Sequence, residues 1–328
     1  MKNHLLSLSD TVALIAAGHP LSIAGPEALL AQLPRGAWIG GTTVYALTEN
    51  GGARIDDRLF VTQFPEATGA TIRHLPTEAL DTLAQGYAPG GVSLVLIPAF
   101  SSAHSAFAMD GMGYPGLFDQ PLMGWVTGVP VEEIGTTAPA VFDGATGLRH
   151  SDGALLMHLA LPQGSSTSLD IVNIFTQSND PATTFCFPRT GFTATEVNVG
   201  GKTVNLARYI TEQGLDTRLP LVANYAGALI NVSIRAVDAE KGEVSFFAPV
   251  VEGAVYHLAN PLADYAAAFA AQIGEGGGGT HSCNCILNYL YGDMAGQKTG
   301  KFIGPVTFGE IAYILLNQTL VKLDIATA

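Results

Sequence analysis

Charged residues are scarce in this chain, and basic residues are scarcer than acidic ones. Only 13% of the 328 residues are charged, and 15 basic residues face 28 acidic ones, for a net charge of −13. Nucleic acids and anionic membrane surfaces are bound mainly through clustered lysine and arginine, and the sequence contains no such cluster. We therefore expect no nucleic acid and no membrane among the partners.

Long hydrophobic runs are also missing, although 48% of the residues are hydrophobic. A membrane helix needs about 20 consecutive apolar residues. The best run, residues 12–17, is broken by Gly18, His19 and Pro20, and Asp10 interrupts any signal-peptide core. We expect a cytoplasmic protein whose apolar residues are buried in large cores or in a homodimer interface.

Cysteines and complete catalytic motifs are few. The three cysteines cannot all pair, and the cytosol keeps thiols reduced, so a disulfide framework is not expected. There is no Gly-x-Ser-x-Gly elbow for a hydrolase. The glycine run 276–279 lacks the Lys-Ser/Thr and the following helix that a phosphate-binding loop requires. An ordinary flexible connection is the better interpretation of that run.

Apolar strand-like runs alternate with helix-like stretches along the chain. "VSLVLIPAF" (92–100) predicts a strand buried on both faces, and 101–111 predicts a helix. Residues 111–130 are rich in Gly, Pro and Met, which is typical of a loop or an apolar lid. A linker is expected near 180–192. We predict an α/β (mixed α+β) fold with two domains, 1–187 and 188–328, each built on a mixed sheet flanked by helices.

"HSCNC" (281–285) concentrates potential metal ligands. In a strand, His281, Cys283 and Cys285 lie on one face, and this donor set suits zinc, copper(I) or iron. Two other interpretations remain. The cysteines are small buried hydrophobes, as free cysteines commonly are, or they form a redox pair, which the spacing of about 6.6 Å on a strand would strain.

Four further residues are candidates for lining a ligand pocket. Thr42 and Thr43 follow Gly40-Gly41 at the end of a predicted strand, where ligands bind in many α/β folds. Glu310 stands in the apolar stretch "FIGPVTFGEIAYILL", so it needs a partner or a raised pKa, and Phe308 shares its strand face. The competing interpretations are strand propensity for the threonines and a solvent-facing glutamate.

Several segments together resemble the FIST family of sensory domains. The C-terminal half carries "TEVNVGGKTVNLARYI", "AVDAEKGEVSFFAPVVEGAVYHLA" and the closing "FIGPVTFGEIAYILLNQTLVKLDI", with "HSCNC" where the family has a Ser-Cys strand. "WIGGTTVYALTENGG" and "PAVFDGATGLRHSDGALLMHLAL" resemble parts of the FIST N-terminal domain. The resemblance implies an intracellular sensor of a small molecule, and some members resemble haem-binding gas sensors.

The chain departs from that family in two ways. The family's Cys-x-x-Arg pattern becomes Cys283-Asn284-Cys285-Ile286, so an arginine is missing. The length leaves no room for an attached output domain, so signalling is expected to need a separate partner protein.

Three hypotheses follow from these patterns. The first is a small-molecule sensor with a pocket near the domain interface. The second is a metal- or haem-dependent sensor that uses the 281–285 cluster or a histidine such as His158. The third is an enzyme with Glu310 as acid/base and Cys283 as nucleophile.

Overall fold

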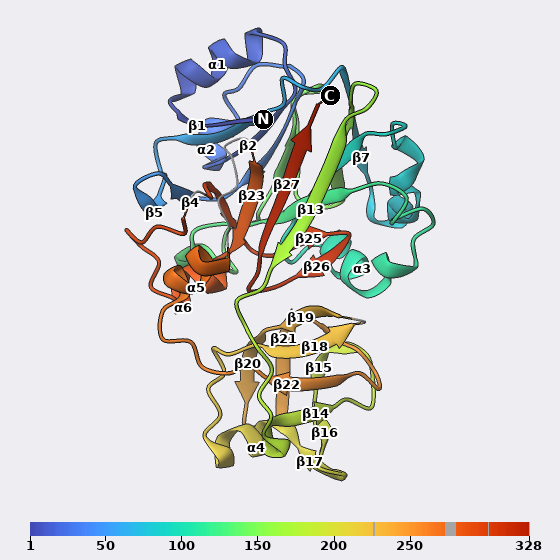
Figure 1. Ribbon diagram of the computed structural model, residues 1–328, viewed down its shortest axis with the longest axis vertical. Coiled ribbons are helices and arrows are strands. Elements are labelled where there is room, and N and C mark those ends of the chain that lie inside the picture. Colours follow the sequence, from blue (N-terminus) through green and yellow to red (C-terminus); the bar gives the residue numbers. More distant parts are fainter. Residues whose placement is uncertain (226, 273–279, 301, 328) are drawn as a thin grey trace.

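The computed structural model describes residues 1–225, 227–272, 280–300 and 302–327. The chain forms a large body and a smaller unit, the insertion unit, that is inserted into the body (Figure 1). The glycine run 276–279 lies outside the described residues. In the described part of the chain, no helix combines the length and the apolar character that crossing a bilayer requires.

The described residues of the body form three six-stranded sheets. The first has the order β1 (Lys2–Leu6), β6 (Leu59–Gln63), β2 (Leu21–Gly25), β3 (Trp38–Thr42), β10 (Val141–Asp143), β11 (Leu148–His150). The second has the order β26 (Ile314–Leu316), β25 (Glu310–Ala312), β9 (Leu122–Thr127), β8 (Val92–Pro98), β12 (Ala154–Ala160), β7 (Gly69–Leu75). The third has the order β13 (Ser166–Val172), β27 (Leu320–Ala326), β23 (Thr280–Cys285), β24 (Gly304–Thr307), β4 (Tyr45–Thr48), β5 (Gly51–Arg54). Parallel pairs β2–β3, β8–β9 and β23–β24 make all three sheets mixed.

Helices cover the outer faces of the sheets. Ile15 of α1 (Leu8–Ala16) and Leu30 of α2 (Glu27–Leu30) pack against the first sheet. The second sheet is covered by η1 (Thr77–Gly86), α3 (Ser102–Asp110) and η2 (Gly111–Gly113). The remaining helical segments of the body are η3 (Val131–Glu133), α5 (Tyr265–Gln272) and α6 (Ile286–Tyr291). The expected mixed α/β class is confirmed.

The inner faces of the sheets share one apolar core. Phe60 of the first sheet, Trp125 of the second and Cys283 of the third belong to the same buried cluster. Gly41 allows this close packing, because a methyl group there would overlap the Trp125 indole. The strand predicted at 92–100 is β8, and it is buried along its whole length.

The insertion unit is a small β structure. Its larger sheet has the order β17 (Lys202–Asn205), β16 (Glu196–Val199), β14 (Thr184–Cys186), β22 (Val255–Leu258), β18 (Leu221–Tyr225), β19 (Ala228–Val232). The smaller sheet has the order β15 (Gly191–Ala194), β21 (Glu243–Val250), β20 (Ile234–Asp238). The described part of this unit also contains η4 (Pro181–Thr183) and α4 (Leu206–Gln213). Its described strand pairings are all antiparallel.

The strand pairing does not follow the expected division into 1–187 and 188–328. The C-terminal strands β27, β24 and β25 pair with β13, β4 and β9 of the first half, so the chain returns to the body after the insertion unit. The expected linker at 180–192 contains β14, which pairs with both β16 and β22. Hydrophobic patterning indicates that a segment is buried, but it does not indicate which strand becomes its neighbour.

Candidate functional site

A cavity of about 210 Å³ lies between the body and the insertion unit. The body contributes the C-terminal part of α3 and the β25–β26 hairpin, which face β18, β19 and β21 of the insertion unit (Figure 1). Buried apolar side chains from both sides line it, among them Phe107, Ile230, Val232, Ala248, Ala312 and Leu315. A cavity of this kind binds apolar ligands, because its walls offer dispersion contacts and few partners for water.

Two tyrosines give the cavity a local polar character. The hydroxyls of Tyr225 and Tyr256 lie 3.1 Å apart, and the Tyr256 hydroxyl also accepts a hydrogen bond from the backbone N–H of Val251 at 2.9 Å. Burial raises the pKa of Tyr256, so its phenol stays protonated near neutral pH. Only one of the two hydroxyls can donate in the hydrogen bond between Tyr225 and Tyr256. The other hydroxyl keeps a proton for which the described residues provide no acceptor. That proton is available to a ligand acceptor.

Apolar side chains of the Gly- and Met-rich segment border the cavity mouth. Met112 and Phe118 are 61% and 56% exposed, and both line the cavity. Tyr313, at the tip of the β25–β26 hairpin, has φ 63° and places its ring centroid 5.4 Å from that of Phe118. The segment therefore lies where a lid would lie. The expectation of a loop over all of 111–130 was too broad, because 122–127 form β9 and Met123 is fully buried.

The predicted pocket residues Thr42 and Thr43 lie elsewhere. The Thr43 hydroxyl donates to the carbonyl of Val306 at 2.7 Å, and the Thr42 hydroxyl accepts from the N–H of Ala140 at 3.0 Å. Both residues line a separate pocket of about 290 Å³ at the end of β3. The Thr43 hydroxyl connects the end of β3 to β24 of the third sheet, and the Thr42 hydroxyl connects β3 to the residue before β10 within the first sheet. Both contacts are structural.

Glu310 is fully buried, two residues before the part of the hairpin that lines the cavity. Its carboxyl accepts hydrogen bonds from the hydroxyl and the N–H of Thr319, at 2.8 and 3.3 Å. Burial raises the pKa of Glu310 to about 8, and these hydrogen bonds oppose the rise. Glu310 is therefore mostly a neutral, hydrogen-bonded acid at pH 7 and does not line the cavity.

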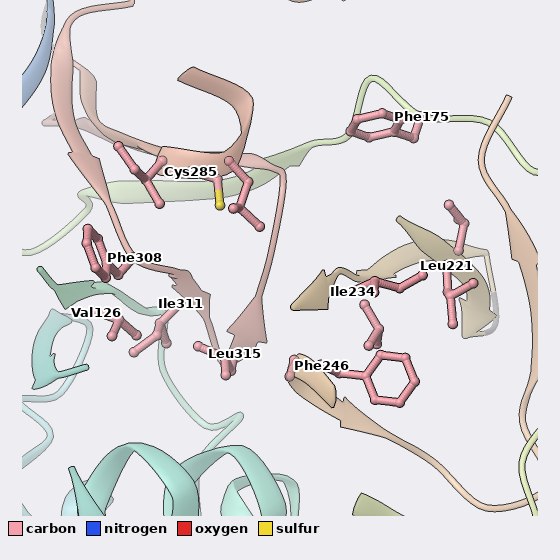
Figure 2. Close-up of a cluster of buried hydrophobic side chains, with 14 of the residues drawn as sticks. Val126, Phe175, Leu221, Ile234, Phe246, Cys285, Phe308, Ile311 and Leu315 are labelled. Carbon is pink, nitrogen blue, oxygen red and sulfur yellow. The ribbon is translucent and has the colours of Figure 1, made fainter. Parts of the chain in front are cut away.

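Phe308 supports the interior of the body. Its ring occupies the space beside Gly128, where a methyl group would overlap it, and it meets the edge of the Phe100 ring at 6.2 Å between centroids. Phe308 is 9% exposed and belongs to the core cluster that also holds Ile311 and Cys285 (Figure 2). It does not line the cavity between the two units.

"HSCNC" forms β23, as expected, and all six residues of the strand are buried. The three side chains that were predicted as metal ligands have other contacts. His281 Nδ1 lies 3.0 Å from the Thr62 hydroxyl, Cys283 Sγ lies 3.6 Å from the carbonyl of Gly124, and Cys285 packs in a different core cluster (Figure 2). Across the described ranges, no three His, Cys, Asp or Glu side chains form a group that could hold a metal ion.

The protonation states agree with that packing. Burial lowers the pKa of His281 to about 4 and raises the pKa values of Cys283 and Cys285 well above the ordinary thiol value. A soft metal needs thiolates, as does a nucleophilic cysteine. The structure therefore does not support the metal site at 281–285, and it shields Cys283 from any substrate in solution.

His158 is also not suited to hold a haem. The side chain is 2% exposed, its Nδ1 lies 2.7 Å from the Ser93 hydroxyl, and a methyl group on Gly86 would overlap its Nε2. Neither ring nitrogen faces a space in which a haem iron could approach.

The architecture defines a two-unit protein with an apolar cavity between its parts. The sequence pattern of a protein family matches residues 6–326, so the chain belongs to DUF6976, a family of unknown function. No curated protein matches the chain. Because the family description names no activity, the function has to be argued from the site.

Proposed function

We propose that this protein is a cytoplasmic sensory protein that binds a small, mainly apolar molecule in the cavity between the body and the insertion unit. The observation that carries this proposal is the cavity itself, whose walls are apolar side chains of both units. An apolar cavity of about 150 Å³ is known to hold benzene. The cavity of about 210 Å³ therefore favours a somewhat larger ring system, such as indole or naphthalene.

Binding between two units provides a route from ligand to signal. The insertion unit is joined to the body by two connections, one before η4 and one after β22. A ligand that contacts both units has a higher affinity for the arrangement in which both walls touch it, and so it shifts the protein toward that arrangement. We infer that a separate signalling protein recognises the change. The resemblance to FIST sensory domains supports the same role.

The first test uses defined apolar probes. Indole and naphthalene should raise the thermal unfolding temperature and show saturable binding by calorimetry, whereas erythritol should do neither. Ala228 lines the cavity and is exposed, so Ala228→Trp should block binding without disturbing a core. Ala182→Trp, at an exposed site of the same unit, is the control. Equal naphthalene affinity in the two variants would contradict the proposal.

A second test addresses the spare tyrosine proton. Quinoline and naphthalene are similar in size, but quinoline carries a ring nitrogen that accepts a hydrogen bond. One hydrogen bond contributes about 1 kcal/mol, which corresponds to about a fivefold change in affinity. In the double variant Tyr225→Phe/Tyr256→Phe, the ratio of quinoline to naphthalene affinity should fall by about that factor. An unchanged ratio would show that the hydroxyls do not contact the ligand.

A further inference from the structure

A second groove between the two units lies at the other end of α3. Its volume is about 510 Å³, and Phe100, Ser101 and Ile134 of the body face Arg235 of the insertion unit across it. Helix α3 extends from this groove, at Ser101, to the apolar cavity at Phe107. The two sites are therefore distinct, although both lie between the units.

Arg235 is a cation without a counterion in this groove. Its guanidinium carbon lies 5.7 Å from the ring centroid of Phe100, over the ring. Among the described residues, no carboxylate lies within salt-bridge distance of Arg235, and its side chain donates no hydrogen bond to any of them. The chain has a net charge of −13, and Arg54, Arg58, Arg149 and Arg218 each have a carboxylate within salt-bridge distance. Among the described arginines without such a partner, Arg235 differs in its place over the Phe100 ring at the edge of a groove. A guanidinium that lies over an aromatic ring and has no carboxylate partner keeps its N–H groups available to a planar anion.

The backbone of Phe100 is in an unfavourable conformation. It connects β8 to α3 with φ 63°, a left-handed conformation that is unfavourable for a bulky residue, and its side chain is still 46% exposed. Glycine would adopt this backbone without strain. The ring is supported from the body by Phe308, which meets it edge to face. A strained and exposed aromatic residue that positions a free guanidinium is typical of a binding site rather than of a core.

We propose that this groove binds a small organic carboxylate, which pairs with the Arg235 guanidinium while Phe100 and Ile134 cover its carbon skeleton. Arg235 is the only cationic side chain that lines the groove among the described residues, and its single charge matches a carboxylate better than a phosphate dianion. The N-terminus of α3 contributes little to binding the carboxylate, because the backbone N–H groups of Ala103 and His104 already donate to the side chains of Asp152 and Ser101.

Benzoate is the probe for this site, with benzyl alcohol as its neutral counterpart and inorganic phosphate as the competing anion. We expect saturable benzoate binding by calorimetry, at least a tenfold loss in Arg235→Ala and a smaller loss in Arg235→Lys, which keeps the charge but not the two-pronged geometry. Arg208→Ala removes an exposed arginine elsewhere in the same unit and should leave binding unchanged. Equal benzoate affinity in Arg235→Ala and Arg208→Ala, or no benzoate binding at all, would overturn the proposal. Tighter binding of phosphate would overturn the carboxylate assignment.

A Phe100→Gly variant separates binding from stability. The substitution relieves the backbone strain and removes a half-exposed ring, so the unfolding temperature should stay the same or rise while benzoate affinity falls several-fold. Unchanged benzoate affinity would refute the role of Phe100. Naphthalene binding to the apolar cavity serves as the independent readout in every variant. Its persistence in Arg235→Ala shows that a failure of this site is not a failure of the proposed function.

Discussion

The buried acid Glu310 should make the stability of this protein fall as the pH rises. Its pKa in the folded chain is about 8, against an ordinary value of 4.5, because burial disfavours the carboxylate. The folded state therefore binds a proton that the unfolded state has lost, so the stabilisation is complete below pH 4.5 and is lost as the pH rises through 8. Over about 3.5 pH units at about 1.4 kcal/mol each, the loss is about 5 kcal/mol.

The substitution Glu310→Gln isolates this contribution. Glutamine is neutral at every pH, and its amide oxygen can still accept from the hydroxyl and N–H of Thr319. At pH 5 the variant should be less stable than the natural protein by no more than about 1–2 kcal/mol, the cost of an imperfect hydrogen bond. At pH 8.5 the order should reverse, with the variant more stable by several kcal/mol.

Urea unfolding at a series of pH values measures the effect, with the free energy of unfolding compared between the two proteins at each pH. The comparison cancels the titration of all other groups. Glu196→Gln, at an exposed position on β16, is the control and should follow the natural protein throughout. Parallel pH profiles for Glu310→Gln and the natural protein would refute the reasoning, because they would mean that Glu310 does not change its protonation on folding.

Three further predictions concern the core. A thiol reagent should leave Cys283 and Cys285 unmodified in the folded protein and should label both in denaturant. The reason is that each side chain is 1% exposed and the pKa of each thiol is raised. Rapid labelling of the folded protein would contradict the packing of β23. The pKa of His281 is lowered to about 4 in the folded protein. The contribution of its neutral form to the free energy of unfolding is therefore present above pH 6.5 and is lost as the pH falls through 4. His281→Gln should therefore reduce the acid sensitivity of the unfolding free energy by about 3 kcal/mol, and an unchanged acid limb would argue against a neutral buried histidine. Gly41→Ala should destabilise the protein by about 1–3 kcal/mol in urea unfolding, because the methyl group meets the indole of the facing sheet. Gly69→Ala, where a methyl group meets no atom within 4 Å, should have little effect, and equal effects of the two would show that the sheets do not pack this closely.

Local sequence patterns were sufficient for several individual elements. The continuous apolar run at 92–100 contains β8, the segment 101–111 contains α3, and "HSCNC" lies in β23. These elements are predictable because alternation, continuous burial and capping residues act over a few neighbouring positions. The mixed α/β class follows from the order of such elements along the chain.

The candidate site depended much more on the tertiary structure. The sequence drew attention to Phe308 and Glu310, but both side chains are buried in the body, and the first residue of the β25–β26 hairpin that lines the cavity is Ala312. Tyr225 and Arg235 carried no local signal, because a tyrosine or an arginine in a strand is unremarkable until its neighbours are known. Composition drew attention to the Met-rich segment around Met112, but it did not place that segment at a cavity, and only the structure shows that Met112 and Phe118 line one.

The sequence by itself determined the mixed α/β class and indicated many of the segments that are buried, helical or extended. Only the tertiary structure decided that the C-terminal strands return to the body. As a result, the insertion unit faces the body across the apolar cavity and across the groove at Arg235. The reason is physical. Burial and propensity are properties of a short window of sequence, whereas strand partners, the neutral state of Glu310 and the cavity between units arise from contacts between residues far apart in the chain.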